Sequence, residues 1–246
     1  MTKLIRADMT RMFRSRILHL MMLLFAGLIV LESAIVTGDD VQAGENVFSS
    51  VIFGMGSMLL PMLVSIGICL MIGAEFTSGG IRNKLTVGHT RQSIYGSWLI
   101  CSFVITLAMV IVLVAASFAS ALIFGIDFSD TNVKATVINL LVMTVCDLSF
   151  TAIIILFSTL FTGVKSVAVA FIYNESTMMI FGIVGEVYKN NEVYKLVCRF
   201  FIQAQMNFYT TAEITDTPWL TALCSGSLGI LATLAGIVSF KRKDLK

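Results

Sequence analysis

The chain has 246 residues, of which 57% are hydrophobic and 13% are charged, and its mean hydropathy is +0.91 with a formal net charge of +2. These values exclude an ordinary soluble domain and indicate a multi-pass membrane protein. Spans of about 20 residues leave room for about six helices with short loops and for no large soluble domain. We therefore predict an all-α protein with a single transmembrane domain over residues 1–246, in contact with membrane lipid and with no nucleic-acid partner.

Residues 1–16 are predicted to form an amphipathic helix at the membrane interface. Its apolar residues recur at helical spacing and share one face: Ile5, Met9, Met12 and Phe13. Cations occupy much of the remaining circumference: Lys3, Arg6, Arg11 and Arg14. Such a helix places its apolar face at the acyl boundary and its cations on anionic headgroups, and a merely basic tail is the alternative.

The hydrophobic runs predict six spans, at about residues 17–36, 51–73, 96–118, 135–156, 166–185 and 219–240. The first run is too long for a signal peptide and lacks a convincing cleavage site, so we expect it to remain as a span. Pro61 is expected to kink the second span because proline removes a backbone hydrogen bond. Only a short turn separates the fourth and fifth spans, which predicts a tight hairpin.

Two further segments complete the predicted architecture. Residues 186–218 are too polar to span the membrane and rich in aromatic residues, so we expect short helices at the outer interface or tucked between spans. In the last span, Ser225 with Gly229 and Ala232 with Gly236 are pairs of small residues that favour close helix packing.

The distribution of cations predicts the orientation. Four of the 17 Lys and Arg residues fall on the outer side of the predicted spans: Lys134, Lys189, Lys195 and Arg199. All the others lie near the two termini, in residues 75–95 or in the turn after the fourth span. Because positively charged segments remain in the cytoplasm, we predict that both termini are cytoplasmic.

Residues 75–95 are a long polar run between the second and third predicted spans. Thr77 or Ser78 is in position to cap a short helix, and Gly88 is a natural stop for it. In this helix Ile81 and Leu85 share a face, flanked by the polar residues Arg82, Asn83 and Lys84. Apolar anchors beside rim charges suit docking on a partner protein. An ordinary positively charged loop is the alternative.

The run GAEFTSGGIRNKLTVGHTRQSIYGSWLI, residues 73–100, resembles the region between the second and third spans of ABC type-2 transporter permeases, especially bacterial ones. The matching positions are Glu75, Phe76, Gly79, Ile81, Arg82, Asn83, Lys84, Leu85, Gly88, Arg91, Ile94 and Tyr95. The sequence departs from the family pattern at Gly80, where Thr is more usual. The rest of the chain agrees with the family in architecture.

The resemblance implies a permease subunit of an ATP-driven exporter in the cytoplasmic membrane of a bacterium. In such a transporter this loop carries the coupling helix, which docks on a cytosolic ATPase, and two ATPases work with two permeases that are identical or related. Neither cofactor nor metal is expected on this chain, since ATP and Mg bind to the ATPases and GVKS, residues 163–166, lacks the spacing of a phosphate loop.

The resemblance also implies that the first, second and fifth spans line the transport cavity. The expected substrate is amphipathic or hydrophobic: an antimicrobial peptide such as a lantibiotic, a drug or a lipid. The alternative is a membrane sensor or receptor that transports nothing and binds a cytosolic partner through the same loop.

Polar residues within the spans form a second candidate set. Asp147 in the fourth span and Glu175 in the fifth are expected at similar depth, with Asn139, Asn174 and Tyr173 as possible partners. Structural hydrogen bonding, a role in the transport path or its gating, and proton movement all remain open. His19 and His89 have no acid or nucleophile at useful spacing, so no catalytic site is predicted.

Overall fold

The computed structural model of the protein describes residues 2–38, 47–126, 131–161, 163–188, 191–205, 209 and 213–243. These residues contain helices and no strand, and six of the helices are long and apolar enough to cross a membrane. The predicted all-α fold with six spans is therefore confirmed. Three parts of the predicted outer segment lie outside the described residues: 189–190, which include Lys189, 206–208 and 210–212.

The six long helices are α2 (Arg16–Gly38), α4 (Met55–Thr77), α6 (Arg91–Phe124), α7 (Val133–Leu160), α8 (Val164–Tyr188) and α11 (Pro218–Arg242). The shorter elements are α1 (Thr2–Phe13), α3 (Val47–Ser49), the π-helix η1 (Ser50–Gly54), α5 (Gly80–Thr86), α9 (Glu192–Cys198) and α10 (Ile202–Gln205). Each predicted span falls within one long helix, with η1 included in the second. Helix α4 continues through Pro61, and a bend at this residue stays a prediction.

Helix α6 is longer than predicted because its ends are set by capping residues rather than by the limits of the apolar run. The Thr90 side chain accepts a hydrogen bond from the Ser93 amide at 3.2 Å, and the helix ends at Gly125, which has a left-handed φ of 66°. At about 1.5 Å per residue a helix of 34 residues is about 50 Å long, which exceeds a hydrocarbon core of about 30 Å. Helix α6 therefore extends beyond the bilayer.

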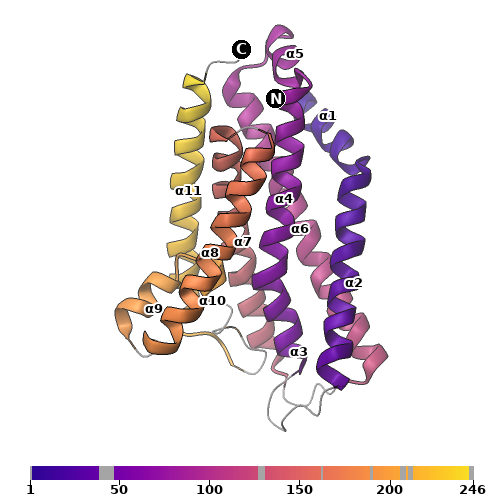
Figure 1. Ribbon diagram of the computed structural model, residues 1–246, viewed down its shortest axis with the longest axis vertical. Helices are drawn as coiled ribbons and strands as arrows, with labels where there is room; N and C mark the ends of the chain where they lie inside the picture. Colours follow the sequence, from indigo (N-terminus) through magenta and orange to yellow (C-terminus); the bar gives the residue numbers. More distant parts are fainter. Residues whose placement is uncertain are drawn as a thin grey trace.

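The long helices lie side by side, and α4 occupies the centre, where it contacts α2, α6, α7 and α8 (Figure 1). Helix α5, the start of α1 and the end of α11 lie together at one end of the bundle, which we call the α5 end. Helices α2 and α8 keep most of their apolar length unburied within the chain, as expected for surfaces that face lipid or another subunit.

The pairs of small residues in α11 do mediate close packing, as predicted. Ser225, Gly229, Ala232 and Gly236 are all buried, and α11 has its most extensive contact with α7. A Cβ atom added to Gly229 would lie 2.9 Å from the Cα atom of Ser149, which leaves no space for a side chain. The two helices approach this closely only because residue 229 is glycine.

We expect Gly229→Ala to lower the free energy of unfolding by about 1–3 kcal/mol, because the new methyl group collides with the α7 backbone. Gly226→Ala in the same helix is the matched control, since a Cβ there meets nothing within 4 Å. The control should be neutral or stabilising by about 0.5–1 kcal/mol. Thermal unfolding of the detergent-solubilised chain measures both, and equal effects would contradict the packing described here.

Candidate functional site

Helix α5 follows α4 after a sharp change of direction at Gly79. This glycine has a left-handed φ of 71° and is the residue before the first turn of α5. The predicted cap by Thr77 or Ser78 is wrong, because both residues belong to the end of α4. The Thr77 hydroxyl donates to the carbonyls of Gly73 and Ala74, each at 3.2 Å, as α4 closes its last turn.

A buried ion cluster holds α5 against the end of α4. The Lys84 ammonium lies 2.8 Å from both carboxylate oxygens of Glu75, whose side chain is only 2% exposed. The indole Nε1 of Trp98 in α6 donates to the same carboxylate at 2.9 Å, and Arg11 of α1 forms an ion pair with it. Glu75 is thus contacted from three other helices.

Asp8 completes this cluster from α1. Its carboxylate lies 2.9 Å from Lys84 Nζ and accepts a hydrogen bond of 2.7 Å from the Ser97 hydroxyl of α6. Five side chains carry the charges and close contacts between α1, α4, α5 and α6, and we call them the ion cluster: Asp8, Arg11, Glu75, Lys84 and Trp98. The face of α1 that is buried against the bundle therefore consists of Leu4, Asp8 and Met12. Phe13, which belongs to the face predicted to lie at the acyl boundary, is 45% exposed.

Burial and the Asp8 carboxylate change the pKa of Lys84 in opposite directions. Burial lowers the pKa of its ammonium group, and the Asp8 carboxylate opposes that change by hydrogen bonding and by its charge. A cation between two buried carboxylates is costly to remove, since its loss leaves two like charges close together without a counterion. The cluster therefore joins four helices into one mechanical unit.

The two predicted docking anchors of α5 do not point away from the chain. Ile81 is 2% exposed and belongs to the hydrophobic core, and Leu85 is half-buried against that core. Ile81 is therefore unavailable to a partner's pocket in this structure. The exposed surface of α5 and its end consists of Arg82, Asn83, Thr86, Val87 and Gly88, and Val87 is 77% exposed.

Arg91 and Phe76 connect this region to the end of α11. The Arg91 guanidinium donates to the carbonyls of Phe240, Lys241 and Lys243 at 3.3, 2.8 and 2.6 Å, where the helix leaves its carbonyls without internal partners. The Phe76 ring packs on those of Trp98 and Phe240, and the Lys243 ammonium lies 5.0 Å from its centroid.

Comparison of the sequence with known protein families identifies the family of this chain. A family of ABC-2 transporter proteins matches residues 4–177. The chain belongs to the ABC-2 transporter family. The matching region contains the whole ion cluster and α5, and it ends within α8. A search of curated proteins gave no match.

Membership of the ABC-2 family, together with six apolar helices, identifies the chain as a multi-pass permease subunit. Such subunits are typically non-catalytic and work with an ATPase. Among the described residues, no group of three or more His, Cys, Asp and Glu side chains is arranged to hold a metal ion.

Asp147 is buried in the middle of α7, with an exposed fraction of 1%. It shares a helix face with Met143, which lies beside Gly56 of α4, and with Thr151, whose hydroxyl is 2.8 Å from that of Thr106 in α6. Asp147 therefore faces the region between α4 and α6. Neither of its carboxylate oxygens has a hydrogen-bond partner among the described residues.

The other predicted polar residues have structural partners. Asn174 donates to Glu175 at 3.1 Å and accepts from Gln203 of α10 at 2.9 Å, which ties the outer segment to α8. Asn139 binds residues before α11, with its amide donating to the Glu213 carbonyl at 2.9 Å and its oxygen accepting from the Thr215 amide at 3.0 Å. Helix α10 contacts α4, α7 and α8, which fits one of the two predicted placements of the short helices, between spans.

Sequence reasoning missed the role of Asp8, Ser97 and Trp98 at the ion cluster. One signal was present in the sequence: Asp8 is the only acidic residue among the cations of residues 1–16. An acid at the centre of the buried face of an amphipathic helix indicates a buried counter-charge nearby.

We expect Lys84→Met to lower the free energy of unfolding by about 3 kcal/mol, because Asp8 and Glu75 would then lack their shared cation. Arg82→Met is the matched control on the exposed side of the same helix and should change it by less than about 0.5 kcal/mol. Thermal unfolding of the purified chain measures both. Equal melting temperatures for the two variants would show that the ion cluster does not stabilise this end of the bundle.

Proposed function

We propose that this permease is the membrane subunit of an ATP-driven exporter, and that α5 is the coupling helix through which an ABC ATPase moves it. The observation that supports this assignment is the ion cluster, which connects α5 to α1, α4 and α6. A force applied to α5 is transmitted to these helices together, because separating any one of them leaves a buried charge without its partner. Rigid displacement of packed helices is a common form of switching.

The exposed surface of α5 provides the docking surface in this proposal. Val87 is a large apolar side chain on the surface, and Arg82, Asn83 and Thr86 surround it. A central apolar contact with a polar rim is the usual composition of a protein interface. Ile81 and Leu85 hold the coupling helix from behind, where they anchor it to its own subunit. Four further residues anchor the coupling helix to its own subunit in this proposal: Glu75, Lys84, Phe76 and Arg91.

The proposed assembly contains two ATPases, which bind ATP and Mg, and a second permease that is identical or related. Helices α2 and α8 are the long helices with the largest unburied share of their apolar length, so they suit the surface toward the second permease. The transport cavity then lies along α2, α4 and α8, the predicted first, second and fifth spans. Both termini and the α5 end face the cytoplasm of a bacterium.

The proposed substrate is amphipathic or hydrophobic, with an antimicrobial peptide such as a lantibiotic as the first candidate and a drug or a lipid as the others. The support is the apolar surface of the helices assigned to the cavity, which gives such a molecule access from the bilayer. Export of a lantibiotic would make the transporter a self-protection system.

We expect Val87→Asp to reduce co-purification of the ABC ATPase with the permease by about tenfold, because a charge replaces the apolar centre of the docking surface. ATP-dependent flux in inverted vesicles should fall in parallel. Val133→Asp is the matched control, since Val133 is 74% exposed and begins α7. Helix α6 starts close to α5 and α7 follows its other end, so Val133 lies away from the α5 end. Both variants should keep the wild-type melting temperature.

Three results would count against parts of this proposal. Full ATPase binding and flux in Val87→Asp would remove α5 as the docking site. ATPase binding without flux of a labelled lantibiotic, drug or lipid by the wild type would favour the non-transporting sensor. Equal losses in Val133→Asp and Val87→Asp would indicate a general effect of a new surface charge.

We propose a separate role for Asp147 in the transport path or its gating. A buried carboxylate without a hydrogen-bond partner is costly, and the described structure shows no contact that offsets the cost.

We expect Asp147→Asn to lower flux while the melting temperature stays within about 2 °C of the wild type. Glu175→Gln is the control and should transport normally, because Glu175 is half-buried and already bonded to Asn174. Normal flux in Asp147→Asn, or a lower melting temperature, would support a structural role instead.

A further inference from the structure

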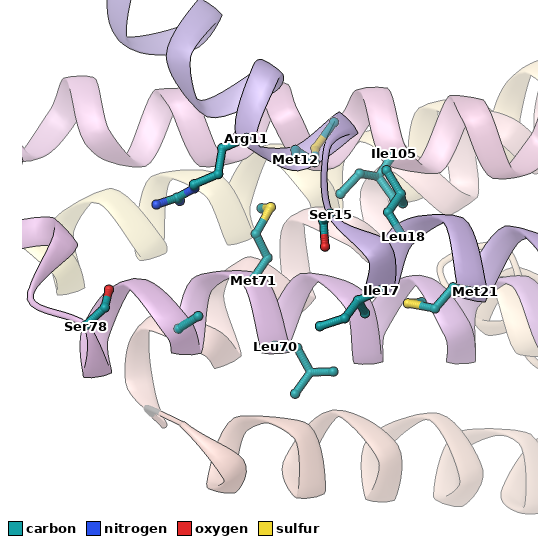
Figure 2. Close-up of a pocket in the computed structure, with 12 residues that line it drawn as sticks. Arg11, Met12, Ser15, Ile17, Leu18, Met21, Leu70, Met71, Ser78 and Ile105 are labelled. Atoms are coloured by element: carbon teal, nitrogen blue, oxygen red, sulfur yellow. The ribbon is translucent and has the colours of Figure 1, made fainter.

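A cavity of about 270 Å³ lies between the turn that joins α1 to α2 and the adjacent stretch of α4. Its wall is mainly apolar and includes Met12, Leu18, Met21, Leu70, Met71 and Ile105 (Figure 2). The volume is near the lower limit for pockets that hold organic ligands. Of the ion cluster, only Arg11 is among the residues that line this cavity, and Asp147 is not one of them.

The cavity opens onto the outer surface of the bundle. Two residues of its wall are largely exposed, Ile17 at 52% and Leu70 at 42%. Exposed apolar side chains on spanning helices face acyl chains or another subunit, and the transport cavity proposed along α2 and α4 is itself accessible from the bilayer. A hydrocarbon chain therefore reaches the cavity directly from the bilayer, without passing through water.

Cations gather beside the same cavity. A groove along α1 is lined by Lys3, Arg6, Thr10, Arg11 and Arg14, and Arg11 also lines the cavity. In Figure 2 the Arg11 side chain lies at the end of the cavity near Ser78. Lys3, Arg6 and Arg14 are exposed and form no ion pair in the described part of the chain.

Arg11 has further N–H donors that are available to a second anion. It pairs with Glu75 through one terminal nitrogen, while its side chain remains 53% exposed. A guanidinium group carries five N–H donors, so the others stay accessible to a phosphate group. The acid of this helix does not neutralise the groove, because Asp8 is buried against Lys84 and Ser97.

We propose that this cavity and the basic groove together bind one anionic glycerophospholipid of the surrounding leaflet. The phosphate group lies among Arg6, Arg11 and Arg14, and an acyl chain enters the cavity. A free phosphate ion would leave the apolar cavity unfilled, and a neutral lipid would leave the cations without an anion. The bound lipid contacts α1, α2 and α4 at once and so holds α1, with its part of the ion cluster, against the bundle.

The test measures lipid retained by the purified full-length chain with native mass spectrometry. The chain is exchanged into micelles that contain phosphatidylglycerol or phosphatidylcholine with identical acyl chains. The wild type should prefer phosphatidylglycerol by about tenfold, since each nearby cation favours an anionic headgroup. No ATPase is needed, so the result is independent of the proposed coupling role of α5.

Two variants separate the headgroup from the acyl chain. Arg6→Gln with Arg14→Gln should abolish the preference for phosphatidylglycerol, whereas Lys241→Gln with Arg242→Gln, the matched control at the end of α11, should retain it. Ala74 also lines the cavity, so Ala74→Phe fills it and should reduce retention of both lipids by about tenfold. Its control, Ala119→Phe at an exposed position of α6, should behave as the wild type. If Ala74→Phe fails to fold, Ser78→Trp at the exposed end of the cavity replaces it.

Three outcomes would overturn the proposal. Wild-type retention in a folded cavity-filling variant, Ala74→Phe or its replacement Ser78→Trp, would show that no acyl chain enters the cavity. An unchanged preference in the Arg6 and Arg14 double variant would show that the groove does not select the headgroup. Binding of soluble glycerol phosphate as strongly as phosphatidylglycerol would identify a site for a free anion rather than for a lipid.

Discussion

The Lys84 ammonium between the carboxylates of Glu75 and Asp8 is the contact on which the α5 end of the bundle depends. Glu75 lies at the end of the central helix, Asp8 on the amphipathic helix and Lys84 on the short helix that turns back from α4. Trp98 and Ser97 bring α6 to the same charges. Because these groups are buried, none of the four helices can move away alone without exposing or unpairing a charge.

Two surfaces meet at this cluster, and each is suited to a different partner. The exposed side of α5 carries Val87 among polar side chains, and the exposed side of α1 carries cations beside an apolar cavity. A cytosolic ATPase and a membrane lipid would therefore act on opposite ends of one set of ion pairs, through Lys84 on one side and Arg11 on the other. In this view lipid composition and ATP binding both bias the position of α1 relative to α4.

Several features followed from local rules and were predictable. The six spans are long apolar runs, Gly88 follows the end of α5 with a φ of 95°, and the small residues of α11 mark a close helix contact. The ion cluster was only partly predictable. The sequence places Glu75 and Lys84 in the coupling segment and Arg11 among the cations of the amphipathic helix, and no local pattern pairs them with one another or with Asp8. Their pairing joins residues as far apart as 8 and 84, and periodicity describes only neighbours within one helix.

The amino-acid sequence by itself determined that this chain spans a membrane, how many times it does so, and that residues 73–100 belong to an ABC-2 permease. Hydrophobic length and a contiguous motif are local properties, so the chain displays them before it folds. Only the tertiary structure decided which side chains of that motif remain on the surface. Ile81 turned inward and Val87 outward because α5 folds back on α4 at Gly79 and its ion pairs with α1 and α4 set which face is buried. Burial depends on contacts between segments that are distant in the chain, and a local pattern does not specify them.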